Sequence, residues 1–162
     1  VFEGAQTVLA SPAAVTATLV KVKEAGPLRA VAVKQPRGNA IEPSDADFAG
    51  AAVYRVDLPD GTDPARDLLL RFHYVGDVAR LYLDGKLLTD NFYNGTPFDV
   101  GLKRYGEAAF KGELLLKVLP LQKGAPIFLQ KSDLPEFGDR ASLCEVISVE
   151  VVETRSEGLV IH

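Results

Sequence analysis

The stretch of residues 68–102, LLLRFHYVGDVARLYLDGKLLTDNFYNGTPFDVGL, decides the fold of this chain. It opens with apolar side chains at every second position: Leu68, Leu70, Phe72 and Tyr74. The intervening positions are more polar and include Arg71 and His73. Successive side chains of a β-strand point to opposite sides, so alternation with a period of two is typical of a strand that buries one face. The stretch therefore begins with a predicted half-buried strand.

A tight hairpin is predicted next. Asp84-Gly85 lies between two apolar runs, and this dipeptide supplies the positive φ angles that a type I′ turn requires. We therefore predict paired strands at 78–83 and 86–89. With a two-residue turn, two pairs face each other across this hairpin: Leu81 with Leu88, and Arg80 with Thr89. Alternation of Phe98, Val100 and Leu102 predicts another strand at 98–102.

The same criteria predict strands on both sides of this stretch, at residues 15–23, 28–34, 52–58, 114–118 and 142–154. In the last of these, Ile147, Val149 and Val151 are expected to share one face. Pro- and Gly-containing loops are predicted at 35–47, 59–64, 103–112 and 131–140, the last with room for one helical turn. Residues 1–14 have no clear period, and 126–130 form a short apolar run.

No window of the chain has a sustained helical period, and strands without intervening helices pair antiparallel in a sandwich or a barrel. We predict an all-β fold, a single antiparallel β-sandwich over residues 1–162. The chain has no initiator Met and no signal-peptide pattern, so we expect it to be a piece of a larger multidomain protein. No apolar run reaches the ~20 residues of a membrane helix.

Ten residues of the central stretch match a known pattern: Phe72, Gly76, Leu81, Tyr82, Asp84, Gly85, Lys86, Thr96, Pro97 and Phe98. The pattern resembles the jelly-roll, galactose-binding-like sandwich domains of β-galactosidases and related glycoside hydrolases. It is most similar to non-catalytic domains of bacterial family 35 β-galactosidases, with a weaker similarity over 29–58 and 112–129. The resemblance implies a jelly-roll accessory domain that packs against the catalytic domain of its parent chain, and it favours a periplasmic or extracellular location.

Composition excludes several classes of partner and chemistry. The net charge of −4 gives no electrostatic basis for binding nucleic acid or an anionic membrane. One cysteine and two distant histidines make a zinc site improbable, and Cys144 is interpreted as a small buried hydrophobe. His73 lies in the middle of a strand, and His162 is the last residue. The 22 acidic residues show no gathered pair of the kind a glycosidase uses, so we predict no catalytic residues and no enzyme activity for this chain alone.

One loop, residues 90–95, has the chemistry of a sugar-binding site. Asp90, Asn91 and Asn94 offer planar polar groups for hydroxyls, and Tyr93 offers an aromatic face. Arg80 on the neighbouring strand could add charge-assisted hydrogen bonds. The alternative is structural, since Asx residues with Gly are common turn formers and the aromatic pair could close the end of the sandwich. Binding of carbohydrate, alone as a lectin-like module or beside a catalytic domain, is therefore one of two open functions.

The resemblance also implies a structural calcium ion, because related sandwiches often carry one. Oxygen ligands are present at Asp45 and Asp47, or at residues 57–63, but any acidic loop would offer the same atoms. No other metal or cofactor is predicted.

Overall fold

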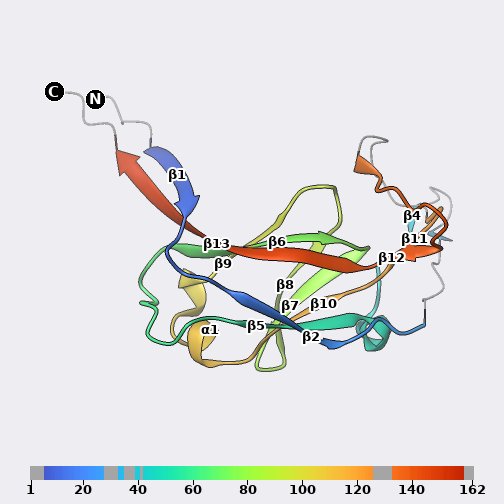
Figure 1. The fold of residues 1–162 in the computed structure, drawn as a ribbon, viewed down its shortest axis with the longest axis horizontal. Coiled ribbons are helices and arrows are strands. Elements are labelled where there is room, and N and C mark those ends of the chain that lie inside the picture. Colours follow the sequence, from blue (N-terminus) through green and yellow to red (C-terminus); the bar gives the residue numbers. More distant parts are fainter. Residues whose placement is uncertain (1–5, 28–32, 35–38, 41, 126–132, 159–162) are drawn as a thin grey trace.

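The chain is an antiparallel β-sandwich of two facing sheets (Figure 1). The computed structural model describes residues 6–27, 33–34, 39–40, 42–125 and 133–158. Sheet A contains, in order across the sheet, β1 (Gln6–Pro12), β13 (Glu145–Gly158), β6 (Leu68–Val75) and β9 (Phe98–Gly101). Sheet B contains, in order, β2 (Thr18–Lys23), β5 (Ala52–Asp57), β10 (Leu114–Val118), β7 (Val78–Leu83) and β8 (Lys86–Phe92).

Short elements complete the described part of the chain. Two small two-stranded sheets pair β3 (Val33–Lys34) with β4 (Asn39–Ala40), and β11 (Leu121–Gln122) with β12 (Ser142–Leu143). The helices are the 3₁₀ helices η1 (Asp45–Gly50) and η2 (Lys103–Tyr105) and the single-turn α1 (Ala108–Lys111). Among the described residues, no helix has the length and apolar character needed to cross a membrane.

The core lies between the two sheets and is built by the alternation read from the sequence. In β6, Leu68, Leu70 and Phe72 are fully buried, and their neighbours on the other face are half-buried. From sheet B, Leu81 and Leu116 project into the same core. The alternating apolar positions therefore mark the inner faces, and the predicted all-β sandwich is confirmed.

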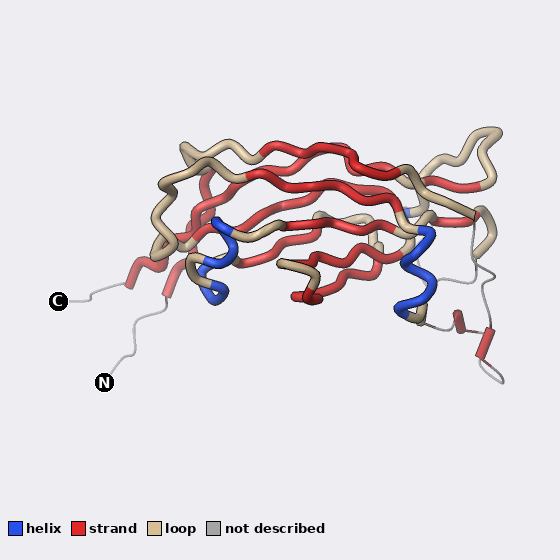
Figure 2. Tube along the Cα trace, turned by 90° about the horizontal axis from the view of Figure 1, so that it is seen from below, coloured by secondary structure: helices blue, strands red, loops and turns tan. Residues whose placement is uncertain are grey.

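The strands define two ends of the sandwich. At the distal end, β6 ends at Val75 and β7 begins at Val78, and the connection of residues 93–97 leaves β8 there. At the proximal end, β13 continues beyond its last β6 partner and pairs with β1, so the first and last described strands leave the body side by side (Figure 1). Figure 2 shows η1 at one end of the strands, and η2 with α1 at the other.

The central hairpin confirms the predicted turn and corrects the predicted register. Asp84 and Gly85 have φ angles of 49° and 81°, as a type I′ turn requires. Leu81 pairs with Thr89, however, and Arg80 pairs with Asp90. Leu88 is an extra residue in β8, a β-bulge that shifts every later pair by one position. The predicted pairs were wrong because a bulge is set by packing and not by the turn.

The last strand carries a second bulge, between Val146 and Ser148. Ile147 is consequently 63% exposed and does not share a face with Val149 and Val151, which contradicts the prediction. The inner face of the strand carries Val146 in its place, because the extra residue reverses the alternation at this point.

Other predicted elements fare differently. The strands predicted at 15–23, 52–58, 98–102 and 114–118 are confirmed as β2, β5, β9 and β10. Residues 1–14, without a clear period, contain β1, and the loop predicted at 103–112 contains η2 and α1. Most of the strand predicted at 28–34, five residues of the loop predicted at 35–47, and all of 126–130 lie outside the described residues.

Candidate functional site

The structure divides the predicted sugar-binding residues between two faces of sheet B. Arg80 and Asp90 are cross-strand partners on the outer face. Asn91 pairs with buried Ala79, so it points to the inner face. Tyr93 follows it and packs against the core. Residues 90–92 of the predicted loop are the end of strand β8, so that part of the prediction was wrong. The connection that follows, at 93–97, projects from an end of the sandwich, and the predicted polar groups do not converge with Arg80.

Arg80 is covered by η1. Its side chain is 7% exposed, and its guanidinium lies 4.1 Å from the centre of the Phe48 ring. Nη1 donates a hydrogen bond of 2.6 Å to Asp45, whose side chain is 94% exposed. A cation stacked on an aromatic face and paired with a carboxylate is a stable anchor for a short helix. Contact between Arg80 and a sugar would require η1 to move away.

Asn91 and Tyr93 form a small polar and aromatic cluster around Tyr74. Asn91 Nδ2 donates to the Tyr74 hydroxyl at 2.7 Å, and that hydroxyl donates to the Asn91 backbone oxygen at 3.1 Å. The rings of Tyr74 and Tyr93 meet edge to face with centres 5.7 Å apart. Burial raises the pKa of both tyrosines. The packing of Tyr93 fits the alternative considered from the sequence, in which the aromatic pair closes the end of the sandwich, but Phe92 is 49% exposed and does not contribute to that closure.

Asn94 uses its side chain to shape its own loop. Its Oδ1 accepts hydrogen bonds from the backbone N–H of Thr96 at 3.0 Å and from the Thr96 hydroxyl at 2.6 Å. This is an Asx turn, and Gly95 beside it has a φ of 82°. Of the five predicted residues, Asp90 and Asn94 are exposed, so they remain within reach of a ligand.

A different place at the distal end has the geometry of a binding site. Where β6 ends and β13 begins, a cleft of about 490 Å³ opens between the sheets. It is lined by Lys21, Val75, Pro135, Glu136, Arg140, Ser142, Leu143, Cys144 and Glu145. The charged and polar members supply an amine, a guanidinium, two carboxylates and a hydroxyl. The volume lies within the range of about 300–1,000 Å³ that small-molecule sites occupy.

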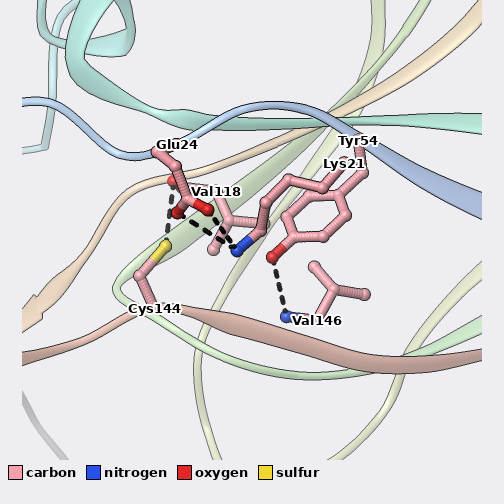
Figure 3. A network of polar contacts seen from close by, with 6 residues as sticks. All are labelled: Lys21, Glu24, Tyr54, Val118, Cys144 and Val146. Carbon is pink, nitrogen blue, oxygen red and sulfur yellow. Dashed lines mark hydrogen bonds and ion pairs between the residues drawn. The ribbon is translucent and has the colours of Figure 1, made fainter.

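Figure 3 shows a network of polar contacts that includes two lining residues of this cleft, Lys21 and Cys144. Lys21 Nζ donates to both carboxylate oxygens of Glu24 at 3.1 Å, and this hydrogen bonding raises the pKa of Lys21. The amine also lies 5.6 Å from the centre of the Tyr54 ring. The Tyr54 hydroxyl accepts a hydrogen bond of 3.5 Å from the Val146 N–H. This network therefore joins β2, β5 and β13 through polar contacts at the edge of the core.

Cys144 is the potential nucleophile of the cleft, and its environment suppresses that role. Burial raises the pKa of its thiol to about 11, and Sγ donates to the Val118 backbone oxygen at 3.5 Å. The thiolate is the reactive form of cysteine, so this thiol is unreactive near neutral pH. Its half-buried position agrees with the structural interpretation made from the sequence.

The sequence does not single out this cleft, because its residues come from distant segments. Lys21 lies on β2, Val75 ends β6, and the rest come from 135–145. An inward-facing lysine on an edge strand is a weak signal, since such charges also protect sheet edges from unwanted pairing. Chemically, the cleft can donate and accept hydrogen bonds around a small polar molecule.

The carboxylates considered for calcium have other partners. Asp45 binds Arg80, and Asp47 accepts a hydrogen bond of 2.7 Å from the Ser44 backbone N–H. Asp57 pairs with Arg55, and Asp63 accepts from the Ala65 N–H at 2.9 Å. Within the described ranges, no group of three or more His, Cys, Asp and Glu side chains is gathered as metal ligands would be. Calcium stays a prediction of the resemblance alone.

Comparison of the chain with protein-family models and with curated proteins finds no matching family and no matching protein.

Proposed function

We propose that this chain is a non-catalytic accessory domain of a β-galactosidase-like glycoside hydrolase, and that its distal end contacts carbohydrate or the catalytic domain. The observation that carries the proposal is the polar cleft between the sheets, at the end of β6 and the start of β13, which offers hydrogen-bond donors and acceptors together. A saccharide presents hydroxyls that both donate and accept, so it needs such a mixed lining. The resemblance of residues 68–102 supplies the class of parent protein.

The position of the cleft supports this use of the distal end. The first and last described strands leave at the proximal end, so the distal end stays clear of both. The distal end also gathers η1, the loop at 93–97 and the β11–β12 pair. Connections carry binding surfaces more often than the strands that hold them. A cleft among connections at one end of a rigid sandwich is suited to positioning a substrate or a partner.

The test is a glycan-binding screen of the purified chain. We expect galactose-containing glycans to bind, and Arg140→Ala and Glu136→Ala to reduce the signal at least about tenfold, the equivalent of about 1.4 kcal/mol. Tyr93→Ala and Asn94→Ala test the loop predicted from the sequence. Lys103→Ala on η2 is the control, since it alters an exposed charged residue at the proximal end, away from both candidate sites.

The outcomes separate the alternatives. Loss of binding in only the Tyr93 and Asn94 variants would place the sugar-binding site in the predicted loop and not in the cleft. Binding that survives in all four alanine variants of these two sites would exclude both sites. A stand-alone lectin-like module is the second candidate, and it is favoured if the isolated chain binds as tightly as the full-length parent. Cleavage of a chromogenic galactoside by the purified chain would contradict the non-catalytic proposal.

A further inference from the structure

The connection at residues 93–97 holds the one asparagine of the sequence that a glycine follows. The chain has three asparagines, Asn39, Asn91 and Asn94, and only Asn94 precedes a glycine. Asn94, Gly95 and Thr96 are all exposed, and Gly95 has a φ of 82°, a value that favours glycine. Because glycine carries no side chain, its backbone nitrogen is open to approach by a neighbouring group.

The side chain of Asn94 is folded back over the peptide bond that follows it. Its Oδ1 accepts hydrogen bonds from the Thr96 N–H at 3.0 Å and from the Thr96 hydroxyl at 2.6 Å. The bond to the N–H closes an Asx turn, in which the side chain takes the place of a backbone segment of a β-turn. The ring of that turn contains both Asn94 Cγ and the backbone nitrogen of Gly95. The turn therefore holds an amide carbon close to a backbone nitrogen.

The two hydrogen bonds also polarise the side-chain amide of Asn94. An attack on Cγ would place the developing negative charge on Oδ1, an oxygen that already has two donors. Hydrogen bonds to a charged oxygen are roughly twice as strong as hydrogen bonds to a neutral one. The two donors therefore stabilise a tetrahedral intermediate more than they stabilise the starting amide, as an oxyanion hole does.

We propose that Asn94 is a site of spontaneous covalent modification, at which water converts the side-chain amide to aspartate and isoaspartate. The Gly95 nitrogen attacks Asn94 Cγ, so a bond forms between these two atoms while the Cγ–Nδ2 bond breaks. Nδ2 leaves as ammonia with the proton that the Gly95 nitrogen gives up, and a cyclic imide remains. Water then opens either C–N bond of the imide ring. Nothing is oxidised or reduced, and water is the only other reactant.

Asn91, on β8, lacks the features that activate Asn94. It is half-buried, and its Nδ2 donates to the Tyr74 hydroxyl at 2.7 Å. The next residue is Phe92, whose side chain shields the backbone nitrogen. The extended backbone of a strand also keeps a side chain away from the nitrogen that follows it. We therefore expect Asn91 to stay unmodified while Asn94 reacts.

Modification would place a carboxylate close to an existing one. Asp133 packs against Gly95, since a Cβ built at Gly95 would lie 3.0 Å from Asp133 Cβ and 3.4 Å from its Oδ1. A negative charge at position 94 is repelled by Asp133, and isoaspartate also lengthens the main chain. We expect both products to weaken the contact between the connection and the segment that continues to Pro135 and Glu136 in the cleft. The inference does not rest on the proposed carbohydrate function, because the reaction uses only the connection itself.

The test is peptide mass mapping of the purified chain during incubation at neutral pH and physiological temperature. A synthetic peptide of residues 90–99, incubated in parallel, gives the rate of the same sequence without the fold. We expect Asn94 to convert about fivefold faster in the folded chain than in the peptide, the effect of one net hydrogen bond. Asn91 of the folded chain should stay unchanged. The rate should rise with pH, because the Gly95 nitrogen must lose its proton.

Two variants of Thr96 separate the hydrogen bonds from the effect of the sequence alone. Thr96→Val removes the hydroxyl donor and keeps the backbone donor, so conversion in the folded chain should slow about threefold. Thr96→Ser is the matched control, because it keeps the hydroxyl and should convert as the wild type does. Circular dichroism checks that each variant is folded. Conversion that is no faster in the folded wild type than in the peptide overturns the proposal, as does a Thr96→Val variant that converts at the wild-type rate.

Discussion

The two outer faces of the sandwich treat their charged side chains in different ways. On sheet A, Arg71 is paired with a carboxylate on the neighbouring strand: it donates to both oxygens of Asp99 at 2.9 and 3.0 Å. On sheet B, Arg55 also pairs with Asp57. Two other cations of that face lie against rings, with Arg80 on Phe48 and Lys117 on Tyr82. The position of Arg80 therefore depends on the helix that covers it, whereas Arg71 depends only on an adjacent strand.

This difference predicts where substitutions are costly. Ion pairs in contact with water contribute little, because hydration competes with the pair. A cation held under an aromatic ring loses its water, and the ring and the helix that carries it become part of the fold. We therefore expect the outer face of sheet B to be sensitive to substitution at η1, and the outer face of sheet A to be tolerant.

The largest expected effect comes from Phe48→Ala. Phe48 is buried with Val78, Ala51 and Leu119 in a small second core between η1 and sheet B. Removing the ring leaves a cavity and uncovers Arg80, so the free energy of unfolding should fall by about 3 kcal/mol. Urea denaturation measures this change in the free energy of unfolding. Ile147→Ala, at an exposed apolar residue, is the control and should change stability by less than about 0.5 kcal/mol. Equal effects of the two substitutions would contradict the expected difference in sensitivity between the two outer faces.

A smaller effect is expected from Arg80→Ala, at about 2 kcal/mol, since a desolvated cation–π contact and the packing of the side-chain stem are both lost. Asp45 adds no penalty because its carboxylate stays hydrated. Arg80→Lys should recover only part of the loss, since an ammonium cannot stack as a guanidinium does. Thermal unfolding compares these variants with Arg71→Ala on sheet A. A larger loss in Arg71→Ala would reverse the proposed contrast between the faces.

Cys144 lies between the two sheets, so its effect on stability does not depend on the contacts of either outer face. Burial raises its pKa from an ordinary value of 9.0 to about 11, so the folded state retains the thiol proton to a higher pH than the unfolded state does. The contribution of this thiol to the free energy of unfolding is fully present below pH 9 and is lost as the pH rises toward 11. At pH 10 the loss is about 1 kcal/mol. The difference in unfolding free energy between wild type and Cys144→Ala should shrink by that amount from pH 8 to 10. A constant difference would mean that the thiol is not desolvated.

The smallest expected effect is the coupling between Arg71 and Asp99. A double-mutant cycle with alanine at both positions should give about 0.5 kcal/mol, reduced further in 1 M salt, because both side chains are partly exposed. The same cycle for Lys117 and Tyr82 should be less sensitive to salt, since a contact with a ring quadrupole is short-ranged. A coupling energy above about 2 kcal/mol between Arg71 and Asp99 would show that the stability of sheet A also depends on contacts on its outer face.

Local patterns were sufficient for most of the strands and insufficient for register. Alternation in residues 68–75 and 114–118 and the Asp-Gly turn at 84–85 are properties of neighbouring residues, and the structure agrees with each. The bulges at Leu88 and near Ile147 are not visible in any local pattern. A bulge forms where two strands must bend to fit a neighbouring layer, so its position depends on contacts far away in sequence.

The candidate site could likewise be predicted only in part from the sequence. The sequence identified a segment with suitable side chains, and that segment does lie at the distal end, although its first three residues continue strand β8. It did not indicate that Asn94 would close its own turn, or that Asn91 would bind the Tyr74 hydroxyl. The cleft draws on β2, on the end of β6 and on residues 135–145, and no spacing in the sequence relates these segments.

By itself, the sequence determined that the chain pairs its strands and which side of most strands is buried, because alternating apolar residues have only one face to hide from water. Only the tertiary structure decided which outer face η1 would cover, and where the sheets would part to form a cleft. Those choices depend on how two twisted layers meet, and the energies involved belong to contacts between segments tens of residues apart.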